Sequence, residues 1–237
     1  MTAILFDLDG VVYQGEQVLP GATQAIAWCR ENHLPHLFLT NTTSRPRQAL
    51  QNKLQNMGIS VLTEQILTPA VAALQWLQQN TRGKVALFIP EATRLEFQSL
   101  TVVANDSNTD VDAVVVGDLG EAWDFSTLNQ AFRLLMREPH PALVALGMTR
   151  YWRGDDGLRL DAGAFVSALA YASGSTPVVL GKPAPLFYEA ALQLLGSTAA
   201  NAIMIGDDIR TDVDAAQKLS IKGVLVRTGK FRPADLT

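Results

Sequence analysis

The chain has 237 residues, of which 48% are hydrophobic and 18% charged, and its formal net charge is −4. This balance is typical of a folded globular protein and excludes a disordered chain. The negative net charge argues against a broad nucleic-acid surface and against attraction to an anionic membrane. The single cysteine, Cys29, excludes an intrachain disulfide and a zinc site built from several thiolates.

The first residues do not have the pattern of a secretory leader. Residues 1–7 lack a basic segment, and carboxylates interrupt the apolar run that follows Met1. No apolar stretch reaches the roughly 18 to 20 residues that a membrane-spanning helix needs. We therefore expect a cytoplasmic protein with neither a membrane nor a nucleic acid as its partner.

Short apolar runs alternate with amphipathic stretches from the start of the chain. The first expected elements are strands at 3–8 and 36–40 and helices at 24–32 and 45–57. Gly58 follows the second helix at the position where a glycine commonly ends one. Cys29 lies on the apolar face of the first helix, so we interpret it as a core residue and not as a nucleophile.

Two further blocks continue the alternation. The middle block is expected to hold helices at 69–80, 91–99, 125–137 and 161–172 and strands at 84–89, 113–116 and 143–146. The last block is expected to hold strands at 177–180, 202–205 and 223–226 and helices at 184–195 and 212–219. Strands that alternate with helices indicate a Rossmann-like α/β core with a parallel sheet, and such sheets bind ligands at the carboxyl ends of their strands.

Polar side chains follow four of the strands expected in this core. They are Asp7 and Asp9, then Thr40 and Asn41, then Lys182, and finally Asp207 and Asp208 with Asp212 beyond them. Because parallel strands end at one edge of a sheet, we expect these side chains to converge. Crowded carboxylates must be neutralised or protonated, and hard oxygen ligands suit Mg²⁺. With a lysine and neutral donors beside them, the set fits phosphoryl transfer through an aspartyl-phosphate.

A family resemblance rests on these same residues. Asp7-Leu8-Asp9-Gly10-Val11, Thr40-Asn41, Lys182-Pro183 and Gly206-Asp207-Asp208 with Asp212 resemble, in order and placement, the four motifs of the haloacid dehalogenase-like hydrolase superfamily. The resemblance implies that Asp7 is the nucleophile and Asp9 the general acid and base. It also implies Mg²⁺ held by the Asp7 carboxylate, the Asp9 main-chain carbonyl and Asp207.

The remaining motif residues receive supporting roles from the same resemblance. Thr40, Asn41 and Lys182 would bind the phosphoryl group, and Asp208 and Asp212 would lie around the metal and the lysine. From the residues alone, Asp208 fits a helix N-cap equally well, and Asp212 a favourable charge in a first helical turn.

The spacing of the motifs indicates an inserted domain. Asp9 lies too close to the Pro20-Gly21 turn for an insertion there, whereas the chain from Thr40 to Lys182 is far longer than one βα unit. The excess corresponds to the α/β C2-type cap of the superfamily. We expect a core domain at 1–68 and 176–237 and a cap domain at 69–175. The stretch 150–165 resembles the NagD-like (subfamily IIA) branch. Within that branch it is similar to the group that contains phospholysine phosphohistidine inorganic pyrophosphate phosphatase and haloacid dehalogenase-like hydrolase domain-containing protein 2.

Substrate choice is expected to depend on the cap. Arg150, Tyr151 and Trp152 follow a predicted cap strand; the arginine could meet an anionic tail, and the rings could stack on a planar group. The same rings could instead form a packed hydrophobic corner beside a solvated arginine. The resemblance implies a phosphatase that acts on a small phosphorylated metabolite, and a homodimer formed through the cap.

Other functions stay open on the same residues. They are transfer of the phosphoryl group to an acceptor other than water, and a binding or scaffold protein on the same fold. A metal-independent dehalogenase is disfavoured because Asp207 and Asp208 make metal binding natural.

Overall fold

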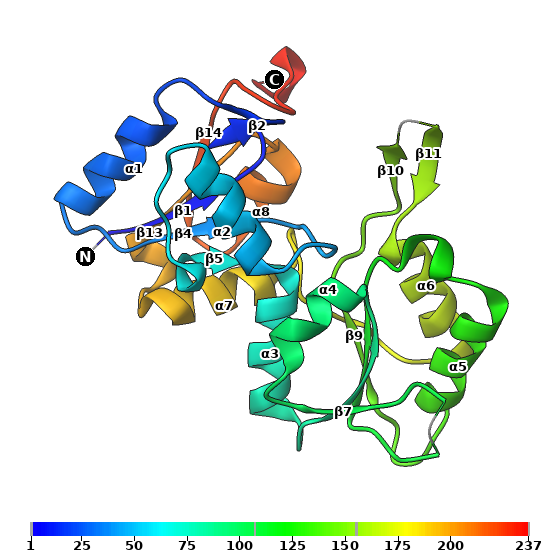
Figure 1. Cartoon of the computed structure of the whole chain (residues 1–237). Helices are drawn as coiled ribbons and strands as arrows, with labels where there is room; N and C mark the ends of the chain where they lie inside the picture. Colours follow the sequence, from blue (N-terminus) through cyan, green and yellow to red (C-terminus); the bar gives the residue numbers. More distant parts are fainter. Residues whose placement is uncertain (1, 107, 155, 237) are drawn as a thin grey trace. The chain divides into compact units, whose positions relative to one another are not determined.

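The structure is a computed structural model that describes residues 2–106, 108–154 and 156–236. The chain forms two compact units, each built around its own five-stranded parallel sheet (Figure 1). The core unit consists of Met1–Asn41, Arg47–Thr68 and Lys182–Thr237, and the second unit of Thr42–Pro46 and Pro69–Gly181. The expected parallel α/β fold is confirmed.

The sheet of the core unit has the strand order β14-β13-β1-β4-β5. Its strands are β1 (Ala3–Asp7), β4 (His36–Leu39), β5 (Ile66–Leu67), β13 (Ala202–Gly206) and β14 (Lys222–Leu225). Every residue of β1 and β4 is buried, as expected of strands covered on both faces. β1 lies at the centre and pairs with β13 and β4, so the carboxyl ends of these three strands meet at one edge.

Helices α1 (Ala22–Glu31) and α2 (Arg47–Asn56) pack on the same face of this sheet, against Ile4 and Phe6 of β1. Cys29 of α1 is 3% exposed within that core, which confirms its predicted place. A two-stranded hairpin, β2 (Tyr13–Gln14) and β3 (Gln17–Val18), follows β1. Helices α7 (Pro185–Leu195) and α8 (Ala215–Lys218) complete the core unit together with short 3₁₀ turns.

The sheet of the second unit has the order β12-β9-β8-β6-β7. Its strands are β6 (Lys84–Phe88), β7 (Thr101–Val103), β8 (Ala113–Val116), β9 (Ala142–Ala145) and β12 (Val178–Val179). Its helices are α3 (Pro69–Asn80), α4 (Glu91–Arg94), α5 (Phe125–Leu135) and α6 (Ala162–Ser173). Apolar residues of α5 and α6 pack on one face of β6, β8 and β9. A separate antiparallel hairpin consists of β10 (Tyr151–Gly154) and β11 (Gly157–Leu160).

The structure corrects the prediction that strand 177–180 belongs to the core sheet. β12 pairs with β9 of the second unit, with Val178 opposite Val144 and Val179 opposite Ala145. A strand of two apolar residues could pair at the edge of either parallel sheet. Val178 and Val179 join the second sheet because the edge beside β9 is open to them. The compact units accordingly divide at Gly181 and Lys182, not before residue 176, and Thr42–Pro46 groups with the second unit.

The predicted helix 212–219 also differs from the structure. The chain turns earlier, in a π-helical segment Ile209–Asp214, and α8 follows it directly. None of the helices in the part of the chain that the structure describes is long and apolar enough to cross a membrane.

Candidate active site

Three buried carboxylates lie together at the carboxyl edge of the core sheet. Asp7 ends β1, Asp207 follows β13, and Asp212 lies in the π-helical segment. One oxygen of each carboxylate lies within 4.8 Å of the other two. Burial raises the pKa of all three groups, because an ionised carboxylate loses its hydration there.

Lys182 lies between two of these carboxylates. Its Nζ is 2.5 Å from Asp7 Oδ1 and 2.7 Å from Asp212 Oδ1. Burial lowers the pKa of the ammonium group, but the two carboxylates outweigh that effect and raise it above its ordinary value. Lys182 is therefore charged, yet one positive charge cannot neutralise three carboxylates, and the cluster favours a further cation.

Lys182 reaches this site although the strand before it belongs to the other sheet. The amide side chain of Asn41 holds the lysine main chain at two points: Asn41 Nδ2 donates to Lys182 O, and Lys182 N donates to Asn41 Oδ1, both at 2.8 Å. Asn41 therefore has a positioning role for Lys182 that the sequence did not indicate. Its neighbour Thr40 is buried at the end of β4, where its N–H donates to Leu67 O.

The carboxylates differ in the oxygens that they leave open to a cation. Both oxygens of Asp212 are engaged, Oδ1 by Lys182 and Oδ2 by the N–H of Asp208 at 3.2 Å. Asp207 Oδ2 accepts from the N–H of Lys230 at 2.6 Å, whereas Asp207 Oδ1 is buried without a hydrogen-bond partner among the described residues. An unpartnered buried carboxylate oxygen fits a bound cation. The described residues thus include an Asp cluster that could bind a metal ion.

Comparisons with known proteins agree with this geometry. Residues 4–102 match a family model described as haloacid dehalogenase-like hydrolase, and residues 179–237 match one described as HAD-hydrolase-like. The human phospholysine phosphohistidine inorganic pyrophosphate phosphatase is 36% identical over 98% of this chain and 85% of its own length. The chain belongs to the haloacid dehalogenase-like hydrolase family.

Two further relatives extend the likeness. Haloacid dehalogenase-like hydrolase domain-containing protein 2 of Pongo abelii is 35% identical over 99% of this chain and 87% of its own length. The solved p-nitrophenyl phosphatase of Archaeoglobus fulgidus superposes with a TM-score of 0.87 at 25% identity, over 98% of this chain and 88% of its own. The chain is a hydrolase of the phosphatase type within this family.

Asp9, the predicted general acid and base of this phosphatase, follows β1 in a tight turn. The turn is closed by the N–H of Gly10, which donates to Tyr13 O at 2.7 Å. The Asp9 side chain is exposed and is not one of the three clustered carboxylates. Its carboxylate is therefore accessible to solvent, as proton exchange with water requires.

Asp208 has the N-cap position that the sequence left open. Its Oδ1 accepts from the N–H groups of Arg210 and Thr211 at 3.0 and 3.1 Å. Burial would raise its pKa, but these two backbone bonds and the positive charge of Lys230, whose Nζ is 3.5 Å from Asp208 Oδ2, together lower it. Asp212, by contrast, is the buried partner of Lys182 and not a surface charge.

Two further residues shape the site, although neither was among the predicted site residues. Tyr188 of α7 is fully buried, and its hydroxyl donates to Thr211 O at 2.5 Å, which fixes the turn that carries Asp212. Gly206 lies against Asp212, and a Cβ on it would lie 2.6 Å from Asp212 Cγ. A tyrosine within an apolar helix resembles core, whereas a glycine directly before an Asp-Asp pair is a signal that could have been used.

The three predicted specificity residues lie at the base of the β10–β11 hairpin. Tyr151 is 52% and Trp152 43% exposed, so the alternative of a packed corner is wrong for both rings. The Arg150 guanidinium carbon lies 5.9 Å from the centre of the Tyr151 ring. Their role in substrate choice stays a prediction.

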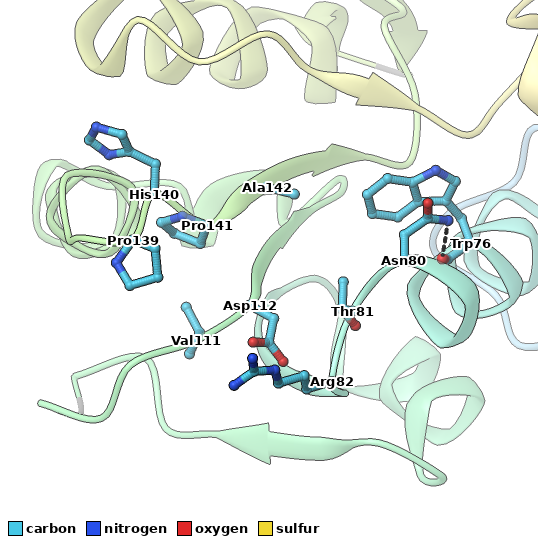
Figure 2. Close-up of a pocket in the computed structure, with 10 residues that line it drawn as sticks. All are labelled: Trp76, Asn80, Thr81, Arg82, Val111, Asp112, Pro139, His140, Pro141 and Ala142. Carbon is cyan, nitrogen blue, oxygen red and sulfur yellow. Dashed lines mark hydrogen bonds between the residues drawn. The ribbon is translucent and has the colours of Figure 1, made fainter.

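A cavity of about 530 Å³ lies in the second unit, at the amino ends of β8 and β9 (Figure 2). The close-up shows the side chains of Trp76, Asn80 and Asp112 at its wall. Asn80 Nδ2 donates to Trp76 O at 2.8 Å, and Asp112 Oδ2 accepts from Lys84 N at 3.0 Å. These polar groups bond their own neighbours, and the predicted site residues are not among those that line the cavity. We therefore assign the chemistry to the carboxylate cluster.

Proposed function

We propose that the protein is a Mg²⁺-dependent phosphatase that hydrolyses a small phosphorylated metabolite through an aspartyl-phosphate on Asp7. The observation that carries the proposal is the buried Asp7 carboxylate, held by Lys182 beside the clustered Asp207. A buried, oriented carboxylate next to a fixed positive charge is what nucleophilic attack on a phosphoryl group requires.

The donor set supports Mg²⁺ as the cation. Asp7 and Asp207 offer hard carboxylate oxygens, and Asp207 Oδ1 is buried without a partner among the described residues. We assign the metal to these two carboxylates and the main-chain carbonyl of Asp9. When bound, Mg²⁺ would neutralise charge on the phosphoryl oxygens and the attacking carboxylate.

The chain's own residues account for both chemical steps. In the first, a carboxylate oxygen of Asp7 bonds to phosphorus while the bond to the leaving atom breaks, and the Asp9 carboxyl group gives that atom its proton. The leaving atom is an oxygen in a phosphate ester or pyrophosphate and a nitrogen in phospholysine or phosphohistidine. In the second, Asp9 takes a proton from water, the water oxygen bonds to phosphorus, and the bond to Asp7 breaks to release phosphate. Lys182 holds Asp7 in place and offsets charge on the phosphoryl group.

The relatives suggest which substrates to try first. One is named for phospholysine, phosphohistidine and inorganic pyrophosphate, and another for p-nitrophenyl phosphate. We propose that this chain acts on substrates of these classes, with Thr40 close to the phosphoryl group and Arg150, Tyr151 and Trp152 acting on leaving-group choice.

The test measures phosphate release from such a panel with and without Mg²⁺, for the wild type and for Asp7→Asn. Loss of the nucleophile should lower kcat at least about 10³-fold, while Asp9→Asn should lower it about 10²- to 10⁴-fold. Acid-quenched wild-type enzyme should carry labelled phosphate on Asp7 after a single turnover. Full activity of Asp7→Asn would rule out the mechanism.

Two further outcomes decide between the alternatives. Appearance of the phosphate on an added alcohol, with little free phosphate, would identify a phosphotransferase. Binding of Mg²⁺ without turnover of any substrate would favour a binding protein on the same fold.

A further inference from the structure

The loop of residues 228–230, hereafter the 228–230 loop, joins two distant parts of the chain at the carboxyl edge of the core sheet. It follows β14, after Val226 N donates to Gly206 O at 2.9 Å. The hydroxyl of Thr228 then donates to Gly10 O at 2.5 Å. The loop is thereby fixed to the turn that carries Asp9.

The same loop encloses one oxygen of Asp207. The N–H of Lys230 donates to Asp207 Oδ2 at 2.6 Å. Gly10 and Gly229 lie next to each other and both face this oxygen: a Cβ on Gly10 would lie 2.7 Å from Asp207 Cγ, and a Cβ on Gly229 would overlap Oδ2 and lie 2.9 Å from Cγ. Both glycines have a positive φ, +86° and +55°. No side chain larger than hydrogen fits at either position without displacing the carboxylate.

The enclosure leaves the two oxygens of Asp207 in different states. Oδ2 is occupied by the main chain of the loop, whereas Oδ1 is buried without a hydrogen-bond partner among the described residues. The carboxylate cannot rotate to exchange its oxygens without losing the Lys230 bond and contacting Gly10 or Gly229. Its orientation is therefore fixed before a cation arrives.

We propose that the 228–230 loop is a positioning element that presents Asp207 Oδ1 to the metal ion, and that Thr228 and Gly229 thereby set the affinity for Mg²⁺ without contacting it. The inference rests on the proposed function, because it presumes that the cluster binds Mg²⁺. It differs from an effect on catalysis, since it predicts weaker metal binding and a kcat that recovers once the metal is saturating.

Gly229→Ala tests the enclosure, and Gly196→Ala is its matched control. Gly196 ends α7 at φ +58°, close to the +55° of Gly229, and a Cβ on Gly196 would have nothing within 4 Å. The two variants therefore carry similar backbone strain and differ in the contacts that the new Cβ of Gly229→Ala makes with Asp207 and with Gly10 Cα, 2.7 Å away. We expect Gly229→Ala to weaken Mg²⁺ binding about 10- to 100-fold by isothermal titration calorimetry, and Gly196→Ala to leave it unchanged.

Thr228 provides a second test that keeps the backbone intact. Thr228→Val removes the hydroxyl that bonds Gly10 O and keeps the shape of the side chain, whereas Thr228→Ser keeps the hydroxyl. We expect Thr228→Val to raise the Mg²⁺ concentration needed for half-maximal activity several-fold, with kcat regained at saturating metal, and Thr228→Ser to restore the wild-type value. This pair decides the question if Gly229→Ala does not fold.

The outcomes separate the two proposals. A wild type that binds no Mg²⁺ would overturn the proposed function itself. A wild type that binds Mg²⁺, with Gly229→Ala and Thr228→Val binding it equally well, would overturn the positioning role alone. Equal losses in Thr228→Val and Thr228→Ser would also overturn it, because they would follow from general destabilisation and not from the hydroxyl.

Discussion

At the scale of single residues, two ion pairs of the same length have very different surroundings. Lys182 Nζ lies 2.7 Å from Asp212 Oδ1 in the interior, and Lys218 Nζ lies 2.7 Å from Asp214 Oδ2 with 73% of the lysine side chain exposed. Water and salt screen the second pair, whereas the first depends wholly on its partners. The distance between the lysine nitrogen and the carboxylate oxygen therefore does not indicate how much each lysine contributes to the stability of the fold.

Replacing the buried lysine should destabilise the protein strongly. Lys182→Met leaves Asp7 and Asp212 buried without their shared counter-charge, which costs about 3–5 kcal/mol in the free energy of unfolding. Lys218→Met is the matched control and should cost only about 0.3–0.5 kcal/mol. Urea unfolding of both variants without Mg²⁺ provides the comparison. If the two lose equal stability, the buried lysine is not what holds the carboxylates together.

At the scale of elements, a carboxylate of the second unit shows how a charged side chain stabilises the start of a helix. Asp124 precedes α5, and its Oδ1 accepts from the N–H of Thr127 at 2.7 Å. That bond favours the ionised form and lowers the pKa of Asp124 below its ordinary value of 3.8. A lowered pKa in the folded state means that the ionised cap stabilises the fold at neutral pH, and that this stabilisation is lost as the pH falls through 3.8 and below.

Asp124→Ala should lower the unfolding midpoint at neutral pH, and the difference from wild type should shrink in acid. Asp124→Asn separates charge from capping, because it keeps an acceptor for Thr127 N–H that does not titrate in this range. Urea unfolding of the three proteins at neutral pH and at about pH 3.5 measures the effect. A gap between wild type and Asp124→Ala that stays constant with pH would contradict the assignment.

The elements also show where sequence patterns suffice. Helix α3 and strand β8 have the predicted bounds, because a long amphipathic run and a four-residue apolar run each allow one assignment. β12 was assigned to the wrong sheet because pairing, not composition, decides which edge a two-residue strand joins. The β10–β11 hairpin was not predicted, since its exposed apolar side chains show neither helical nor strand periodicity toward a core.

For the site, motif order predicted which residues cluster but not how they are held. The meeting of Asp7 and Asp207 follows from strand ends at one sheet edge, whereas Lys182 follows a strand of the other sheet. The bonds from Asn41 to the Lys182 main chain, and from the Lys230 N–H to Asp207, use backbone atoms that every residue has. Such contacts leave no mark in a sequence, so only coordinates could reveal them.

At the scale of the whole molecule, each sheet has its own core. The buried residues that pack between the second sheet and helices α5 and α6 all lie between Ala86 and Leu169. All five strands of this sheet lie between Lys84 and Val179. One nearly continuous segment thus contains a complete layer of helices on a parallel sheet, which is the requirement for independent folding.

We therefore expect residues 69–181 to fold when expressed alone. The segment leaves out Thr42–Pro46 and with it the bond from Thr93 Oγ1 to Thr43 O, a loss of about 1 kcal/mol that a five-stranded unit should tolerate. Cooperative thermal unfolding followed by circular dichroism would confirm the expectation, and a gradual, non-cooperative loss of signal would contradict it.

The same fragment tests the homodimer that the family resemblance implies, which stays a prediction. If this unit mediates dimerisation, the mass measured by light scattering will be twice that of a single 69–181 fragment, because the surface that pairs the two copies is then retained in the fragment.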